Sequence, residues 1–142
     1  VLSATGMDSL TKIANRNFFN SYVQKLVQED VKFALFIIDI REFKKINEKL
    51  GYHSGDEILK SFASRLQGFV GNSGFIARIG SNEFSIVKRT DTFSGVNSLD
   101  YAQDMKKKLV TTYTSLHGAE SNLGINIGIA SYPQHGDDIK NK

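Results

Sequence analysis

Residues 33–44 read FALFIIDIREFK, and this stretch decides the fold of the chain. The six consecutive apolar residues from Phe33 to Ile38 are too few for a buried helix and predict a central strand covered on both faces. The run brings one carboxylate, Asp39, to its end and turns at once into a charged segment. Asp39 is therefore either a candidate functional group or, more simply, a helix cap or surface turn residue.

Helical and strand patterns flank this strand on both sides. Apolar residues recur at helical spacing in four segments. These are residues 15–29, 42–50, 57–70 and 99–116. Alternating apolar residues predict three further strands. These are residues 75–79, 83–88 and 123–132. The order of elements predicts an α+β fold, with one antiparallel-rich sheet and helices mainly on one face.

A short turn, Gly80-Ser81-Asn82, separates two of the predicted strands. Glycine and asparagine tolerate positive φ, so this turn predicts a tight antiparallel hairpin. If the hairpin lies beside the first strand, its tip faces the end of that strand. We therefore expect Asp39 to lie opposite Ser81, Asn82 and Glu83.

Length and composition indicate a single domain of ordinary size. The chain has 142 residues, no cysteine and a formal net charge of +3. Disulfides and thiolate metal sites are therefore excluded, and a reducing compartment is allowed. The only basic triplet, Lys106 to Lys108, would spread around a helix as a solvated face, so we expect no nucleic-acid partner.

The sequence also indicates the cellular compartment that we expect for this chain. It contains no apolar run of the roughly 18 residues that a membrane helix needs, and no leader opens it. We expect a soluble, cytoplasmic fragment without membrane contact, although the full-length protein could be membrane-anchored. Residues 1–7 read as the tail of a linker.

Four segments, in order and at family spacing, resemble the GGDEF family of diguanylate cyclase domains. They are residues 8–19, 39–56, 78–84 and 128–136. Lys12 and Ile13 are small departures, since Gly and Leu are usual there. The resemblance implies a ferredoxin-like, nucleotidyl-cyclase palm over residues 8–142, with the family's last helix and strand absent from this chain. We expect the protein to continue beyond Lys142.

The family joins two GTP molecules into cyclic di-GMP on a dimer, and this reaction requires a divalent metal. The resemblance assigns metal ligation to the Asp39 carboxylate, the Ile40 carbonyl and the acidic third residue of the signature. Here that signature reads Gly80, Ser81, Asn82, Glu83 and Phe84, so an amide replaces the acid. Mg²⁺ prefers charged oxygen ligands, and an amide brings no charge. We therefore expect Mg²⁺ binding to be weak or absent.

Arg41 is a second departure, because the family usually has an aspartate there. A guanidinium at this position would pair with Asp39 or Glu83, or touch phosphate directly. Together with Asn82 it shifts the local formal charge by about three units, which disfavours a divalent cation. Ser81, in place of Gly, adds a Cβ where the backbone approaches the phosphates.

The positions that would bind nucleotide match the family's motif more closely than the positions that would bind metal. By resemblance, Asn47 and Asp56 contact the guanine edge, and Phe43 and Lys44 hold phosphates at a helix N-terminus. The simpler alternative is that Asp56 caps a helix beginning at Glu57 and that Asn47 is an exposed helical residue. The family's inhibitory Arg-x-x-Asp site is replaced by residues 71–74, GNSG, so we do not expect product to bind there.

Three functions follow from this comparison. We expect a degenerate GGDEF domain that senses GTP, or holds a homodimer, and regulates a fused EAL phosphodiesterase or sensor domain. The alternatives are an active diguanylate cyclase with a relaxed signature, and a purely structural dimerisation unit.

Overall fold

A central four-stranded sheet organises the computed structural model, which describes residues 6–90, 97–114, 118 and 120–132. The strands lie in the order β2-β3-β1-β6, and each neighbouring pair is antiparallel. Their bounds are Phe75–Gly80 (β2), Glu83–Arg89 (β3), Phe33–Ile40 (β1) and Ile125–Tyr132 (β6). Residues 1–5 of the linker expected at residues 1–7, and residues 133–142, lie outside the described residues.

The strand β1 is the centre of the sheet, as its uninterrupted apolar run predicts. Its side chains alternate between two faces, and each face is covered by a separate hydrophobic cluster. Phe36, Ile38 and Ile40 are fully buried on one face, while Phe33 and Leu35 pack on the other. A strand buried on both faces explains why apolar residues occupy consecutive positions.

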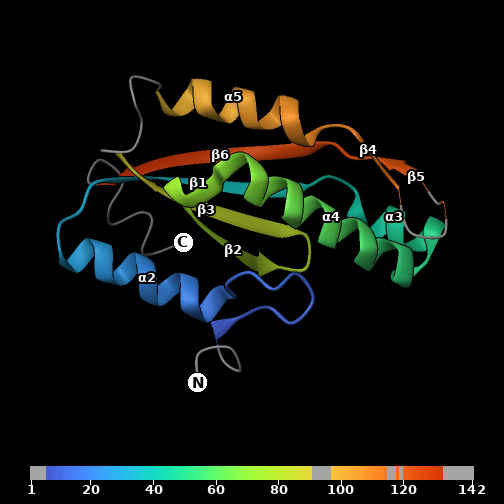
Figure 1. Cartoon of the computed structure of the whole chain (residues 1–142), viewed down its shortest axis with the longest axis horizontal. Coiled ribbons are helices and arrows are strands. Elements are labelled where there is room, and N and C mark those ends of the chain that lie inside the picture. Colours follow the sequence, from blue (N-terminus) through green and yellow to red (C-terminus); the bar gives the residue numbers. More distant parts are fainter. Residues whose placement is uncertain (1–5, 91–96, 115–117, 119, 133–142) are drawn as a thin grey trace.

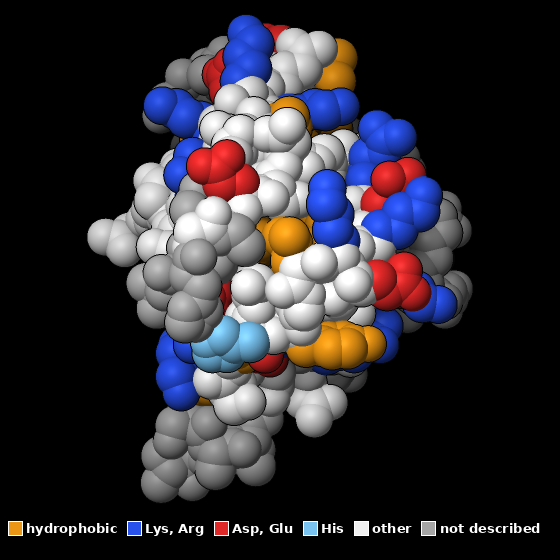
Figure 2. All heavy atoms as spheres, turned by 90° about the vertical axis from the view of Figure 1, so that its right-hand side faces the viewer, with side chains coloured by type: hydrophobic (Ala, Val, Ile, Leu, Met, Phe, Trp, Pro, Cys, Tyr) orange, Lys and Arg blue, Asp and Glu red, His pale blue; other side chains and the backbone are white. Residues whose placement is uncertain are grey.

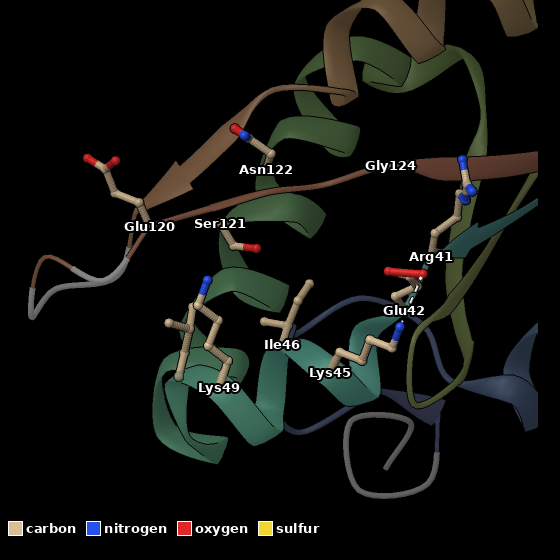
Figure 3. A pocket seen from close by; sticks show the side chains of 10 residues that line it. Arg41, Glu42, Lys45, Ile46, Lys49, Glu120, Ser121, Asn122 and Gly124 are labelled. Carbon is tan, nitrogen blue, oxygen red and sulfur yellow. Dashed lines mark ion pairs between the residues drawn. The ribbon is translucent and has the colours of Figure 1, made fainter.

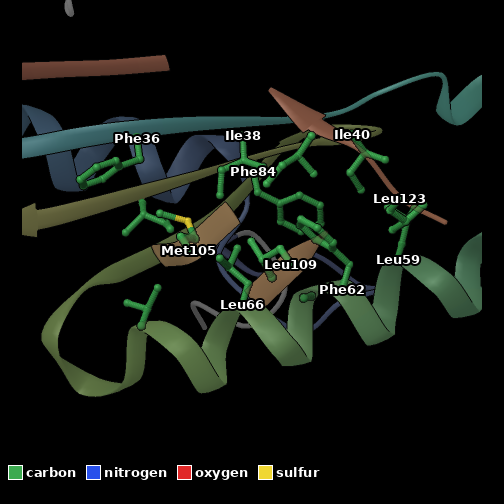
Figure 4. Close-up of a cluster of buried hydrophobic side chains, with 14 of the residues drawn as sticks. Phe36, Ile38, Ile40, Leu59, Phe62, Leu66, Phe84, Met105, Leu109 and Leu123 are labelled. Atoms are coloured by element: carbon green, nitrogen blue, oxygen red, sulfur yellow. The ribbon is translucent and has the colours of Figure 1, made fainter. Parts of the chain in front are cut away.

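Helices cover both faces of the sheet (Figure 1). The helix α2 (Arg16–Gln28) packs on the β2 side and supplies the smaller cluster. On the other face, α4 (Tyr52–Val70) and α5 (Ser98–Leu109) build the larger cluster (Figure 4). The α+β fold is confirmed, and among the helices that the structure describes α2 covers the face opposite α4 and α5.

The segment after β1 forms two helices in immediate succession. The helix α3 spans Phe43–Leu50, and α4 begins at Tyr52, so the start predicted for the helix at residues 57–70 is wrong by five residues. Gly51 adopts φ 90°, which ends α3 and allows the chain to start α4 at the next residue. The Gly55 amide donates to the Gly51 carbonyl at 3.0 Å, which makes residues 52–55 the first turn of α4.

The helix predicted at residues 99–116 ends earlier, at Leu109. Val110 turns to extended backbone and begins a run of β-branched residues, which favour strand geometry. The chain then forms a small hairpin from β4 (Thr112–Thr114) and β5 (Glu120–Asn122), which the sequence did not predict. Leu116, counted in the predicted helix, lies outside the described residues.

Tyr113 fixes this helix end. Its buried hydroxyl donates to the Leu109 carbonyl at 2.8 Å and so satisfies a carbonyl that has no partner within the helix. Burial raises the pKa of Tyr113 to about 12, while the Arg65 guanidinium opposes this shift.

In the part of the chain that the structure describes, no helix combines the length and the apolar character required to cross a membrane.

Candidate functional site

The end of β1 and the tip of the β2–β3 hairpin meet as the sequence predicts. Asp39 is in register with Glu83 across the β1–β3 pair. The Asn82 side-chain amide donates two hydrogen bonds from Nδ2, to Asp39 Oδ1 and to the Ile40 carbonyl, both at 2.9 Å. The Ile40 amide in turn donates to the Asn82 carbonyl at 3.0 Å. Asn82 is therefore bound to the end of β1 by three hydrogen bonds.

The orientation of the Asn82 amide is set by its surroundings. Both neighbours of Nδ2 are acceptors, so the –NH₂ group must face them. On the other side, the Ser81 hydroxyl donates to Asn82 Oδ1 at 3.4 Å. A rotated amide would direct its oxygen at a carboxylate and a carbonyl and lose both hydrogen bonds that Nδ2 donates.

The residues at this point do not fit a divalent metal ion. The two oxygens that the resemblance assigns to metal, on Asp39 and Ile40, both accept from Asn82 instead. Among the described residues, no group of three or more His, Cys, Asp or Glu side chains could hold a metal. Glu83 does not complete such a group. Its carboxylate packs against Gly80, so closely that a Cβ added at Gly80 would lie 2.6 Å from Glu83 Oε1.

The alternative that Arg41 pairs with Asp39 or Glu83 is wrong, because among the described residues neither carboxylate forms a salt bridge with it. The alternative that Arg41 contacts phosphate stays a prediction. The Arg41 amide donates to the Gly124 carbonyl at 2.9 Å, and its side chain packs against Gly124. Gly124 precedes β6, on the side of β1 away from the hairpin. The backbone bond thus draws Arg41 away from the signature residues.

Arg41 instead lines a hollow of about 510 Å³ between α3 and β5 (Figure 3). Lys45 and Lys49 line the same hollow from one face of α3, which begins two residues after Arg41. The hollow also holds Glu42 and Glu120, and Glu42 pairs with Lys45 at 3.6 Å. Figure 2 shows the same mixture of basic and acidic side chains over this end of the molecule. This face therefore lacks the single-sign basic patch typical of nucleic-acid binding.

The junction of α3 and α4 contains a polar atom without a partner. Asn47 Oδ1 is buried and has no hydrogen bond, although Asn47 itself is only half-buried. It lies directly against Gly55, where any Cβ would overlap with it, and a Cβ there would also come within 3.5 Å of the Phe43 ring. A buried amide oxygen without a donor is costly, and an outward turn of the Asn47 side chain toward a ligand that supplies a donor would relieve that cost.

Asp56 and Lys44 lie near this junction and are both exposed. Asp56 belongs to the second turn of α4, so the alternative that it caps a helix beginning at Glu57 is wrong. Lys44 is three residues before Asn47 on α3 and therefore shares its face of the helix. The two candidate groups for a base and the candidate lysine for phosphate therefore lie on two consecutive helices.

The N-terminus of α3 leaves backbone amides without an intrahelical partner. Lys45 and Ile46 both donate to the Glu42 carbonyl, so the Phe43 and Lys44 amides precede the first intrahelical bond. No side chain caps this end, and Glu42 adopts φ 55°. Two outward amides and the positive end of the helix favour an anion such as phosphate.

An ion pair between Arg78 and Asp8 connects the β2–β3 hairpin to the segment that precedes α2. The Arg78 Nη1 atom lies 3.2 Å from Asp8 Oδ2, and Nη2 donates to the Ser81 carbonyl at 2.7 Å. Thr11 donates to the same Asp8 oxygen through its amide and its hydroxyl. Asp8, Thr11 and Arg78 lie within the segments that resemble the family, but this ion pair and its bond to the hairpin were not predicted. The signal available was a charged residue among the apolar neighbours of a predicted strand.

Burial and hydrogen-bonding partners shift the pKa of Asp8 in opposite directions. Partial burial by itself would raise the pKa of Asp8, but the hydrogen bonds from Thr11 and the charge of Arg78 outweigh it. The net result is a pKa below the ordinary value of 3.8.

Nearly the whole chain is similar to known proteins of one family. The family model described as "Diguanylate cyclase, GGDEF domain" matches residues 5–142. Diguanylate cyclase TpbB of Pseudomonas aeruginosa is 31% identical over 134 residues, which cover 92% of this chain and 31% of TpbB. MucR of the same species, named as a bifunctional diguanylate cyclase/cyclic di-GMP phosphodiesterase, is 29% identical over 133 residues, which cover 91% of this chain and 19% of MucR.

Solved structures show the same fold. A diguanylate cyclase/phosphodiesterase from Caldicellulosiruptor saccharolyticus superposes with a TM-score of 0.84 over 97% of this chain and 82% of that chain. At 21% sequence identity, this likeness shows the fold alone. The chain spans less than a third of the length of either curated relative, TpbB or MucR.

Proposed function

The chain belongs to the GGDEF family of diguanylate cyclase domains, and from that premise we propose that it is a regulatory member which binds guanine nucleotide and has lost cyclase activity. Its relatives are proteins of cyclic di-GMP signalling, as the names of TpbB and MucR state. Regulation, nucleotide binding and the loss of cyclase chemistry are our proposals for this chain.

One observation carries the loss of activity. The Asn82 amide donates to both oxygens, on Asp39 and Ile40, that would hold the metal. Phosphoryl transfer between two triphosphates depends on divalent metal to neutralise charge and to position the attacking hydroxyl. A neutral amide supplies neither a negative ligand nor a base near neutral pH.

A different set of residues supports nucleotide binding. When the Asn47 side chain turns out of the junction, its unpartnered Oδ1 can accept from a ring or amino N–H of guanine, and the Asp56 carboxylate suits the paired N–H donors of the same base. Adenine lacks that pair of donors. Phe43, Lys44 and the start of α3 provide amides and a positive charge for phosphates.

The regulated partner is a domain on the same protein. MucR, a relative, is named for both cyclase and phosphodiesterase activities, which supports an attached EAL phosphodiesterase. We propose that nucleotide binding, or homodimerisation through this domain, changes the activity of such an EAL or sensor domain.

Calorimetric titration with GTP tests the binding proposal, with ATP as the control ligand. We expect GTP to bind and ATP to bind at least tenfold more weakly. Gly55→Ala should reduce GTP affinity by tenfold or more, because its Cβ displaces the Asn47 amide. Gly68→Ala is the matched control in the same helix, since a Cβ there meets no atom within 4 Å.

The binding proposal fails if GTP and ATP bind equally, or if Gly55→Ala binds GTP as tightly as the wild-type protein. A product assay tests the loss of chemistry. The purified full-length protein is incubated with GTP and either Mg²⁺ or Mn²⁺, and formation of cyclic di-GMP would establish the alternative of an active cyclase.

A further inference from the structure

We propose that the Asn82 side-chain amide is a built-in substitute for the divalent cation, so that this domain takes up guanine nucleotide without metal. The proposal rests on the nucleotide site proposed above and concerns the form of the ligand that this site accepts.

The first step is the position of the –NH₂ group. Nδ2 lies 2.9 Å from Asp39 Oδ1 and 2.9 Å from the Ile40 carbonyl oxygen, and it directs one hydrogen to each. A positive group shared between a carboxylate and a backbone carbonyl is what a bound cation would also provide. Here the partial positive charge of the amide hydrogens takes that place.

The second step is the cross-link that this contact makes. A metal shared by β1 and the hairpin would hold the two segments together. Asn82 does so with its own atoms, because its backbone carbonyl also accepts from the Ile40 amide at 3.0 Å. The end of β1 and the hairpin tip are therefore joined without an ion.

The third step is competition. A cation at this point must displace the amide, which breaks two hydrogen bonds to Nδ2 and leaves a single carboxylate, Asp39, as the charged ligand. Mg²⁺ loses its water reluctantly and prefers charged oxygens in octahedral array. Displacement of the amide is therefore unfavourable, and this position excludes the ion.

The consequence for the nucleotide concerns its phosphates. The positive groups left to bind them are Lys44 and the N-terminus of α3, which attract free GTP more strongly than its Mg²⁺ complex because the free form carries more negative charge. We expect GTP to bind at least as tightly in EDTA as in excess Mg²⁺.

Thermal unfolding with the metal alone tests the substitution without nucleotide. We compare the wild-type protein, Asn82→Asp and the control Asn20→Asp in EDTA, MgCl₂ and MnCl₂. Asn20 is exposed on α2 and gives the same change of charge away from the site. In EDTA we expect a lower Tm for Asn82→Asp, since two carboxylates then face each other. Metal should raise that Tm by several degrees and leave the other two proteins unchanged.

An equal rise in Tm for the wild-type protein would overturn the proposal, as would an Asn82→Asp protein that shows no response to metal. If Asn82→Asp does not fold, direct titration of the wild-type protein with Mn²⁺ decides the question. Saturable binding at micromolar Mn²⁺ would overturn the proposal, and its absence would support it.

Titration of the wild-type protein with GTP separates this inference from the proposed function. Binding that occurs only with Mg²⁺ present contradicts the amide substitution and leaves the nucleotide site intact. Failure to bind GTP under either condition contradicts the nucleotide site and with it the metal-free uptake proposed here, whereas the metal response of Asn82→Asp still tests the substitution itself.

Discussion

Arg78 is the residue that connects the opening segment of the domain to its signature turn. It reaches Asp8 on one side and the Ser81 carbonyl on the other, and its backbone amide donates to the Ala14 carbonyl at 2.8 Å. Its side chain is mostly buried, as is that of Asp8. A partly buried ion pair with several hydrogen bonds stabilises more than a surface pair does.

Asp8→Asn should reduce stability in a pH-dependent way. The pKa of Asp8 is lowered in the folded protein, so its contribution is complete above the ordinary value of 3.8 and is lost as pH falls through the lowered pKa. We expect Asp8→Asn to cost about 1 kcal/mol at neutral pH. The difference from the wild-type protein should shrink toward zero as the pH falls well below 3.8.

Urea unfolding at neutral and acid pH measures this difference. Asp104→Asn, which removes an exposed carboxylate on α5, is the control and should change stability little at either pH. A difference for Asp8→Asn that stays constant across this pH range would contradict the assignment.

The sequence predicted part of this site at the residue scale. The proximity of Asp39 and Asn82 could be predicted, because strand pairing fixes which residues lie opposite each other. The direction of the Asn82 amide could not, since it depends on two acceptors on another strand. The path of Arg41 could not either, because it follows from a backbone bond to Gly124, more than eighty residues away in the chain.

At the scale of elements, the helix predicted at residues 99–116 shows the limit of periodicity. Leu109 and Tyr113 are separated by four residues and both are buried, so their spacing fits a helix. The chain nevertheless leaves the helix at Val110, and Tyr113 returns to the core from β4. Hydrophobic spacing indicates which residues are buried but not the backbone conformation between them. A continuous helix and a helix followed by a strand can both bury Leu109 and Tyr113. The strands of the main sheet were better predicted, because their alternation has a different period from a helix.

The beginning of α5 depends on a cap outside the helix. The Asn97 side chain accepts from the Asp100 amide at 2.8 Å, which satisfies one of the first free amides of the helix. Asn97→Ala should therefore lower the free energy of unfolding by about 1 kcal/mol. Asn97→Asp should keep most of the stability, since a carboxylate also accepts this bond.

Asn20→Ala is the matched control, because Asn20 is exposed in the interior of α2 and alanine is the better helix former. This change should raise the free energy of unfolding by a few tenths of a kcal/mol. Urea unfolding measures both variants, and losses of equal size would show that Asn97 is not a cap.

For the whole molecule, stability comes from two hydrophobic clusters separated by the sheet. The larger one joins the sheet to α4, α5 and the β4 strand, and the smaller one holds α2. Phe62 lies at the centre of the larger cluster, with its ring 5.2 Å from Phe84 and 6.0 Å from Tyr113. It therefore connects α4 to both β3 and β4.

Phe62→Ala should lower the free energy of unfolding by about 3–5 kcal/mol, since it removes buried apolar surface and leaves a cavity. That loss is a large share of the roughly 5–15 kcal/mol that stabilises a domain of this size. Phe62→Leu should cost less, because most of the volume is kept. Urea unfolding measures both changes, and a cost below about 1 kcal/mol for alanine would show that the site is not tightly packed.

The position of β1 in the middle of the sheet has a consequence for synthesis on the ribosome. Phe33 pairs with Arg89 on one side and with Tyr132 on the other. The second edge of β1 can therefore close only after residue 132 has been made, roughly ten seconds after β1 at usual translation rates. During that interval an apolar strand has an open edge, which is the kind of surface that pairs with other nascent chains. Slower expression at lower temperature, or a holding chaperone, should raise the soluble yield of this domain.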